Sequence, residues 1–220
     1  MNAGLKHLNL WKQQLTTAPE SLWQMTALES LILADNRLAL LPEEIGALTN
    51  LHTLDLGHNQ LTDLPESLGR LTSLTNYLYL HDNQLASIRD SLFARLTRLR
   101  YLNVSNNRLT RLPDTIGNLS NLREFRADHN LLAALPESFA ALTRLQEVHL
   151  RDNQFQTVPA PIRGLERLED LDLRGNPFTT VPDWIAELPT LRKLDLRWVA
   201  LETIPHWIEK LEARDCRVLL

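Results

Sequence analysis

The chain has 220 residues, of which 44% are hydrophobic and 23% are charged, and its formal net charge at pH 7 is −4. These values are ordinary for a soluble protein, and the small negative charge gives no reason to expect nucleic acid or a membrane surface as a partner. The sequence lacks a stretch of ~18 continuous apolar residues, as a membrane span would need, and residues 1–11 lack the apolar core and cleavage site of a signal peptide.

One unit recurs along nearly the whole chain, and residues 51–73 give its clearest form, LHTLDLGHNQLTDLPESLGRLTS. The underlying pattern is L-x-x-L-x-L-x-x-N-x-L-x-x-L-P-x-x-L-G-x-L. A unit this short cannot bury its own apolar face, so its copies must stack on one another. The sequence therefore predicts nine repeats over residues 1–213 and a C-terminal capping strand over residues 214–220. The repeats begin at residues 5, 28, 51, 74, 99, 122, 145, 168 and 191.

Each repeat divides into two segments of different periodicity. The x-L-x-L-x segment alternates, which is typical of a strand with one buried face. The L-P-x-x-I-G-x-L segment predicts a short helical or 3₁₀ turn, because proline fixes φ at the start of the turn. The strands are then parallel and joined by crossovers of the usual right-handed sense. We therefore predict an α/β solenoid, a right-handed horseshoe with a concave parallel β-sheet and short helical or 3₁₀ turns on the convex side.

The fourth repeat is irregular, since it has 25 residues where the others have 23. One extra residue precedes its strand in LTNYLYL, and the other lies in the return segment SIRDSLFARL, where Arg89 replaces the usual proline. Two interpretations are open. The insertion is either a bulge tolerated at a repeat junction or a local change of curvature on a binding face.

An asparagine follows the strand in seven of the repeats. A buried amide at this point can satisfy backbone groups that a sheet ladder does not reach, so we expect a structural column. Its members are Asn36, Asn59, Asn83, Asn107, Asn130, Asn153 and Asn176.

The two ends of the array differ. Cys216, Val218 and Leu220 alternate as a closing strand would, whereas the N-terminal repeat has no comparable cap. An uncapped strand edge is able to pair with another chain. We therefore expect either a protein that continues upstream, or a monomer or a homodimer formed through the N-terminal edge.

Outward-facing strand positions in the first five repeats carry aromatic and aliphatic side chains among small neutral ones. They are Trp11, Ile32, Tyr77, Tyr79 and Tyr101. The three tyrosines should lie together on adjacent strands, and Tyr and Trp are enriched at binding hot spots. Cross-strand stacking that stabilises the sheet is the alternative. We predict that these residues bind a partner.

The last four repeats are almost wholly charged on the same face. We predict partner-binding roles for Arg126, Arg151, Arg174, Arg197, Asp172, Asp195 and Trp198. The arginines either form a surface lattice with neighbouring carboxylates, at about 0–1 kcal/mol per pair, or are directed at a partner's carboxylates or phosphates. The interleaved acidic residues disfavour a nucleic-acid groove, which would be mostly basic.

Metal-capable side chains also occur near the edge of this face, at Asp35, His58, His81 and Asp82. Ligands one repeat apart in a single row are ~4.8 Å apart with parallel side chains, which is poor geometry for one ion. The sequence thus predicts no metal site and no cofactor. It also lacks P-loop, G-x-G-x-x-G, G-x-S-x-G and C-x-x-C motifs, so we predict that the chain is not an enzyme.

The scaffold residues Leu51, Leu54, Leu56, Asn59 and Pro65, with their equivalents, resemble those of leucine-rich repeat proteins. The 23-residue LPxxIGxL unit is similar to that of intracellular Ras-suppressor and scaffold-type members and of bacterial ones. This resemblance implies a non-catalytic signalling or regulatory scaffold that binds a protein on its concave face. The alternative is the recognition domain of a larger enzyme or bacterial effector, such as a ubiquitin ligase or kinase, whose catalytic part lies elsewhere.

The cysteine content bears on the compartment. Secreted members of this family usually close their ends with disulfide-bonded caps, and the single Cys216 cannot form one. The sequence therefore favours a cytoplasmic location or a bacterial protein without such caps. An effector exported unfolded and acting inside a host cell is the alternative.

Overall fold

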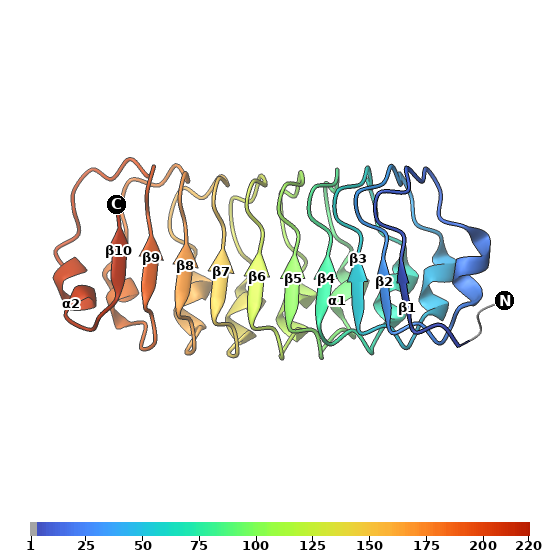
Figure 1. Cartoon of the computed structure of the whole chain (residues 1–220). Helices are drawn as coiled ribbons and strands as arrows, with labels where there is room; N and C mark the ends of the chain where they lie inside the picture. Colours follow the sequence, from blue (N-terminus) through green and yellow to red (C-terminus); the bar gives the residue numbers. More distant parts are fainter. Residues whose placement is uncertain (1–3) are drawn as a thin grey trace.

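The computed structural model describes residues 4–220, which form one continuous solenoid (Figure 1). Ten parallel strands make a single sheet and follow one another in sequence order. The strands are β1 (His7–Asn9), β2 (Ser30–Ile32), β3 (Thr53–Asp55), β4 (Tyr77–Tyr79), β5 (Tyr101–Asn103), β6 (Glu124–Arg126), β7 (Glu147–His149), β8 (Asp170–Asp172), β9 (Lys193–Asp195) and β10 (Arg217–Leu219). In β2 to β9 the middle residue is buried, as the alternating pattern predicted.

Short helices run along the side of the solenoid opposite the sheet (Figure 1). A proline directly precedes every 3₁₀ helix and fixes the backbone where the turn begins. These helices are η1 (Glu20–Gln24), η2 (Glu43–Ala47), η3 (Glu66–Arg70), η4 (Asp114–Asn118), η5 (Glu137–Ala141), η6 (Ala160–Gly164) and η7 (Asp183–Glu187), and the α-helices are α1 (Asp90–Phe93) and α2 (Ile208–Glu212). The predicted solenoid, with a parallel sheet along one side and helical turns along the other, is confirmed.

The core is one hydrophobic column between the sheet and the helices. In the third repeat Leu54, Leu56 and Leu68 are completely buried, and their equivalents in the neighbouring repeats stack against them. Phe125 and Phe139 fill the same column in the sixth repeat, with their rings edge to face at 5.5 Å. Burying each such side chain contributes about 1.5–3 kcal/mol, so this column is the main source of stability.

The asparagine column connects successive turns, as predicted. Asn59 is typical: its Nδ2 donates to the carbonyls of Leu33, Leu56 and Gly57 at 3.0–3.1 Å. Its Oδ1 accepts the N–H of Leu38 in the preceding repeat at 3.0 Å. Because each amide bonds backbone groups in two repeats, the turns after the strands are held in a fixed spacing.

The fourth repeat absorbs its two extra residues outside the strand. The N–H groups of Thr75 and Asn76 both donate to the carbonyl of His52, at 3.3 and 3.0 Å, ahead of β4. On the return side, α1 replaces the usual 3₁₀ turn, and Arg89 pairs with Asp63. The strand register on both sides of β4 stays regular, so the insertion is a bulge at the repeat junction.

The sheet ends differently at its two edges. β10 pairs with β9 in parallel, and the side chain of Cys216 is buried just before it. Within residues 4–220, β1 pairs only with β2, which leaves its outer edge open. No helix in this described part of the chain is long and apolar enough to cross a membrane.

Candidate functional site

The outward side of the sheet gathers the side chains that the core does not use. We call this surface the sheet face. It is formed by the first, third, fifth and sixth residues counted from the start of each strand from β1 to β9. Its aromatic half lies over β1 to β5, and its charged half lies over β6 to β9. The strand register puts corresponding residues of consecutive repeats side by side, so each position forms a row along the solenoid.

The tyrosine cluster comprises Tyr77, Tyr79 and Tyr101 on the adjacent strands β4 and β5. The rings of Tyr77 and Tyr79 are stacked with centroids 5.6 Å apart, and Tyr101 lies 5.4 Å from Tyr77 and 5.0 Å from Tyr79. Tyr77 is 44% exposed, while the other two are half-buried. Burial raises the pKa of Tyr101 to about 12 and also raises the pKa of Tyr79, so both phenols remain hydrogen-bond donors at neutral pH.

Trp11 and Ile32 lie apart from the tyrosine cluster. Trp11 is 50% exposed beside the open edge, and the Lys12 ammonium lies 4.4 Å from its ring centroid. Ile32 is half-buried on β2. The strand β3 separates both residues from the tyrosines, and its outward residues Thr53 and Asp55 carry no large apolar group. The structure therefore divides the predicted aromatic surface into two groups.

In the charged half, two carboxylates lie beneath two guanidinium groups. Arg174 Nε donates to both oxygens of Asp172 at 2.9 and 3.0 Å. Arg197 donates from Nε and Nη2 to the two oxygens of Asp195 at 2.9 and 2.8 Å. The two pairs are linked, because Arg174 Nε is also 3.5 Å from Asp195 Oδ2.

Two of the predicted contact residues are buried by this arrangement. The sequence placed Asp172 and Asp195 on the exposed face, but the structure leaves them only 2% and 1% exposed because the arginines fold over them. Burial alone would raise the pKa of Asp195, yet the hydrogen bonds from Arg197 and the charges of Arg174 and Arg197 together outweigh it, and the pKa of this carboxyl lies below its usual value. The aspartates thus orient the guanidinium groups and offer a partner little surface of their own.

The arginine–tryptophan patch completes the charged half. It consists of Arg174, Arg197 and Trp198, with the guanidinium carbons 5.5 and 5.9 Å from the centroid of the tryptophan ring. Trp198 is 69% exposed, so this cation–π contact contributes about 0.5–1 kcal/mol. The patch thus places one exposed aromatic ring and two guanidinium groups at the C-terminal end of the sheet face.

The other two predicted arginines point elsewhere. Arg126 Nε is 2.5 Å from Glu124 Oε1 on the same strand. Arg151 turns toward the rim, where its Nη2 is 2.6 Å from His129 Nε2 and its Nε is 3.4 Å from Asp152 Oδ2. Of the two interpretations of the arginine row, the ion-pair lattice therefore describes the contacts that these side chains make within the chain.

The row formed by the sixth residues, at the rim, has a left-handed backbone conformation, also at Lys12 and Trp198. Asp35, His58, Asp82, Asn106, His129 and Asp152 have φ between 51° and 57°, and Gly175 is at 65°. Asp, Asn and His tolerate this region better than other residues with side chains do. The abundance of these residue types along the rim is therefore explained first by backbone conformation.

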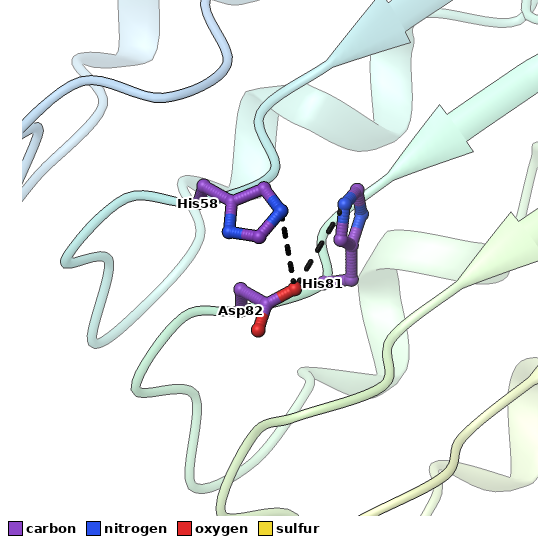
Figure 2. A group of neighbouring side chains, drawn as sticks. All are labelled: His58, His81 and Asp82. Carbon is purple, nitrogen blue, oxygen red and sulfur yellow. Dashed lines mark ion pairs between the residues drawn. The ribbon is translucent and has the colours of Figure 1, made fainter.

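Two groups of metal-capable side chains nevertheless converge on the sheet face within residues 4–220. In each group the three candidate ligand atoms lie within 4.8 Å of one another. One group is His58, His81 and Asp82, drawn in Figure 2. The other is Glu124, Glu147 and His149. The sequence placed His58, His81 and Asp82 near one another but predicted poor geometry from the spacing within single rows, whereas each group combines two rows.

The sequence matches models of one protein family. The model described as "Leucine-rich repeat region" matches residues 77–214, and the model described as "Leucine Rich repeats (2 copies)" matches residues 49–93. A search of curated protein sequences gave no match.

Similar solved structures come from bacteria and plants. A leucine-rich repeat protein of Leptospira interrogans is 31% identical with a TM-score of 0.91, over 99% of this chain and 55% of that one. The leucine-rich repeat domain of the type III effector XopL is 27% identical with a TM-score of 0.73, over 87% and 76%.

A third structure is the ectodomain of the Arabidopsis thaliana receptor kinase GASSHO1/SCHENGEN3 in complex with CASPARIAN STRIP INTEGRITY FACTOR 2. It is 30% identical with a TM-score of 0.63, over 82% of this chain and 25% of that one. The chain thus spans about half of the Leptospira protein and a quarter of the plant one.

Proposed function

The chain belongs to the leucine-rich repeat family, and on that premise we propose that it is a non-catalytic module that binds a protein partner through its sheet face. The observation that carries the proposal is the tyrosine cluster, in which three rings on adjacent strands contact one another and Tyr77 remains 44% exposed. Among the similar structures, the plant receptor ectodomain was determined in complex with a factor, which is the same class of function.

The tyrosine cluster suits binding because it is ordered before a partner arrives. Tyr79 and Tyr101 are held by burial and by ring contacts, and they fix Tyr77 in turn. Aromatic side chains with two torsions lose little conformational freedom on binding, and preorganisation reduces that loss further. The cluster would therefore receive an apolar or aromatic side chain of the partner, with the phenol groups as donors at its edge.

The charged half supports a different part of the same proposal. Its guanidinium groups are already paired within the chain, so a partner would have to compete with Asp172 and Asp195 for them. Charges of this kind affect association rate and specificity more than affinity. We propose that the aromatic half supplies most of the binding free energy and that the charged half selects the partner's orientation.

The wider role that we propose is a signalling or regulatory scaffold in the cytoplasm of a bacterium. The alternative is the recognition domain of a larger enzyme or of an exported effector acting inside a host cell. Two similarities support that alternative. One is to an effector's repeat domain, and the other is to a Leptospira protein of nearly twice the length. Sequencing the gene on both sides of this reading frame distinguishes the two, because only the alternative requires an adjoining catalytic domain.

Affinity capture from an extract of the source organism tests the binding proposal. The bait is the full chain, compared with Tyr77→Ala and with the control Leu40→Ser, which alters a side chain that is 68% exposed beside η1 and η2. We expect one protein to be captured by the wild type and the control but depleted by Tyr77→Ala. Equal capture by all three baits would contradict the assignment to the tyrosine cluster.

A further inference from the structure

The group His58, His81 and Asp82, which we call the rim histidine site, is positioned by two adjoining turns (Figure 2). His58 and Asp82 are equivalent residues of the third and fourth repeats, and both have left-handed backbones with φ of 51° and 52°. The N–H of His58 donates to the carbonyl of His81 at 3.0 Å, which holds the two turns side by side. The three side chains therefore start from a backbone that is hydrogen-bonded in place.

The donor atoms surround a common point. His58 Nε2 is 3.5 Å and His81 Nε2 is 3.9 Å from the same oxygen, Asp82 Oδ2 (Figure 2). Both distances exceed that of a hydrogen bond, so the three groups approach one another without bonding directly. Ligands at about 2.0–2.2 Å from a tetrahedral ion are ~3.4 Å apart, so a small rotation of the imidazoles brings them to coordination distance.

The ring of His81 has a prepared position. A Cβ atom at Gly57 would lie 2.3 Å from Cε1 of His81, so the absence of a side chain at this residue makes room for the imidazole. The ring also meets His58 and Tyr79 edge-on, with centroids 5.0 and 5.7 Å away. Its Nε2 is the nitrogen directed at Asp82, 3.9 Å from Oδ2, whereas its Nδ1 is buried on the side of the ring away from that contact.

Backbone conformation explains two of the three residues but not the third. His58 and Asp82 occupy left-handed positions that favour Asp, Asn and His in any case. His81 is not among the residues with positive φ, so the turn does not select its type. The ring and the gap at Gly57 are therefore features of this one place in the array.

We propose that the rim histidine site binds a divalent transition-metal ion, and that Zn²⁺ is the ion its ligands suit best. Two imidazole nitrogens and one carboxylate oxygen are typical zinc ligands, whereas Ca²⁺ and Mg²⁺ prefer sites made of oxygen alone. Three protein ligands leave a fourth position, and the side chain of His58 is 58% exposed, so that position faces solvent. The ion would tie the third repeat to the fourth at the rim.

The second group, Glu124, Glu147 and His149, is less suited to bind a cation. Glu124 is already paired with the guanidinium of Arg126 at 2.5 Å, which places a fixed positive charge beside any ion bound there. His149 faces Asp172 as well as Glu147, at 4.0 and 3.5 Å. The fixed charge of Arg126 beside Glu124 disfavours a cation in this group, so the proposal concerns the rim histidine site alone.

The chain contains a matched control for this site. In the sixth and seventh repeats, His129 and Asp152 occupy the rim positions of His58 and Asp82, with Nδ1 and Oδ2 3.3 Å apart. The residue before Asp152 is Arg151, whose Nη2 lies 2.6 Å from His129 Nε2. A cation therefore stands where the third ligand would be, and this pair should not bind zinc.

The test uses the full chain after treatment with a chelator and buffer exchange. Calorimetric titration with Zn²⁺ should show one equivalent bound, and Co²⁺ should give visible absorption bands of a nitrogen- and oxygen-ligated ion. We expect His58→Ala and Asp82→Asn each to weaken Zn²⁺ binding by at least about tenfold. His129→Ala should leave the affinity unchanged.

Two further measurements guard against an effect of folding. Circular dichroism should be the same for all variants, because the altered side chains lie on the rim. Zn²⁺ should raise the midpoint of thermal unfolding of the wild type and of His129→Ala but not of His58→Ala, since an ion that binds only the folded state stabilises it. Absence of Zn²⁺ uptake by the wild type, or an equal loss in His58→Ala and His129→Ala, would overturn the proposal.

Discussion

The two halves of the sheet face satisfy their side chains in opposite ways. In the charged half, the guanidinium groups of Arg174 and Arg197 are bonded to aspartates of the same chain, and the aspartates are buried in consequence. In the aromatic half, the tyrosine cluster is held by contacts among its own rings and still exposes Tyr77. The strands of both halves have the same length and regular register, so the difference arises from their outward residues.

An exposed position in the sequence pattern is therefore not always a surface that a partner can bind. The many charges over β6 to β9 suggest a recognition surface from sequence, yet their interactions are largely made within the chain. The tyrosines over β4 and β5 contact one another through their rings, and a partner can pack against these rings without displacing them. A partner therefore gains more from apolar contact with the aromatic half than from exchanging one ion pair for another.

The largest effect on stability should come from removing a buried carboxylate in the charged half. Asp195→Ala removes two hydrogen bonds from the Arg197 side chain and one from its N–H, and it leaves Arg174 without a second carboxylate. We expect the free energy of unfolding to fall by up to about 3 kcal/mol, as for the loss of hydrogen bonds to a charged group. Urea denaturation followed by tryptophan fluorescence measures it.

Asp55→Ala is the control for this variant, taken from the aromatic half. Asp55 Oδ1 accepts the N–H of Gly57 at 2.9 Å, just as Asp195 Oδ1 accepts the N–H of Arg197 at 3.3 Å, but no arginine lies over it. We expect a loss of about 0.5–1.5 kcal/mol, which is the usual contribution of one hydrogen bond. Equal losses for the two variants would show that the arginine pairs contribute nothing to folding.

Tyr77→Ala should have the next largest effect, and on binding rather than folding. Truncating an aromatic hot spot costs about 2 kcal/mol or more of binding free energy, equivalent to roughly a 30-fold weaker Kd. Because Tyr77 is 44% exposed, we expect the unfolding midpoint to change little. Titration calorimetry with the captured partner measures the affinity, and a loss of stability as large as the loss of binding would favour cross-strand stacking as its main role.

A smaller effect should appear in the dependence of stability on pH. The pKa of Asp195 is lowered in the folded state, so its charged form contributes stability that is present above its unfolded pKa of about 3.9 and lost as pH falls through the folded value. The wild type should therefore lose its stability advantage over Asp195→Asn on acidification below about pH 4. A constant difference between the two proteins from pH 7 to pH 3 would exclude this linkage.

The repeat pattern predicted the scaffold because each scaffold residue recurs at a fixed spacing. The strands, the buried asparagines and the contact of Tyr77 with Tyr101 all follow from register alone. Burial of Asp172 did not follow, since an aspartate at the third strand position is outward by alternation. Arg174, two residues later, folds back over Asp172, and His149 Nδ1 lies 4.0 Å from its Oδ2.

The rim histidine site shows the same limit in another form. Its convergence depends on the left-handed turns at His58 and Asp82 and on the space over Gly57. If side chains within a row are treated as parallel, no contact is predicted between His81 in the row of fifth residues and His58 in the row of sixth residues. Side-chain arrangement between rows is therefore what the structure adds to a repeat sequence.

The smallest effect on binding should follow from removing the charge of Arg197, which is already paired within the chain. The side chain of Arg197 is 43% exposed, but its guanidinium is bonded to Asp195 and lies 5.9 Å from the centroid of the Trp198 ring. We expect Arg197→Ala to weaken the affinity for the partner by less than about threefold, which is within the range of a surface ion pair. The change should act mainly on the association rate. Binding kinetics at low and high salt measure both quantities.

Tyr77→Ala, measured under the same two conditions, is the reference for that variant. Loss of an apolar contact should raise the dissociation rate with little dependence on salt, whereas loss of a guanidinium should lower the association rate most at low salt. If Arg197→Ala instead raised the dissociation rate as much as Tyr77→Ala, the guanidinium would have left Asp195 to contact the partner directly. The two halves of the sheet face would then contribute alike, because the ion pairs of the charged half would be exchangeable in the complex.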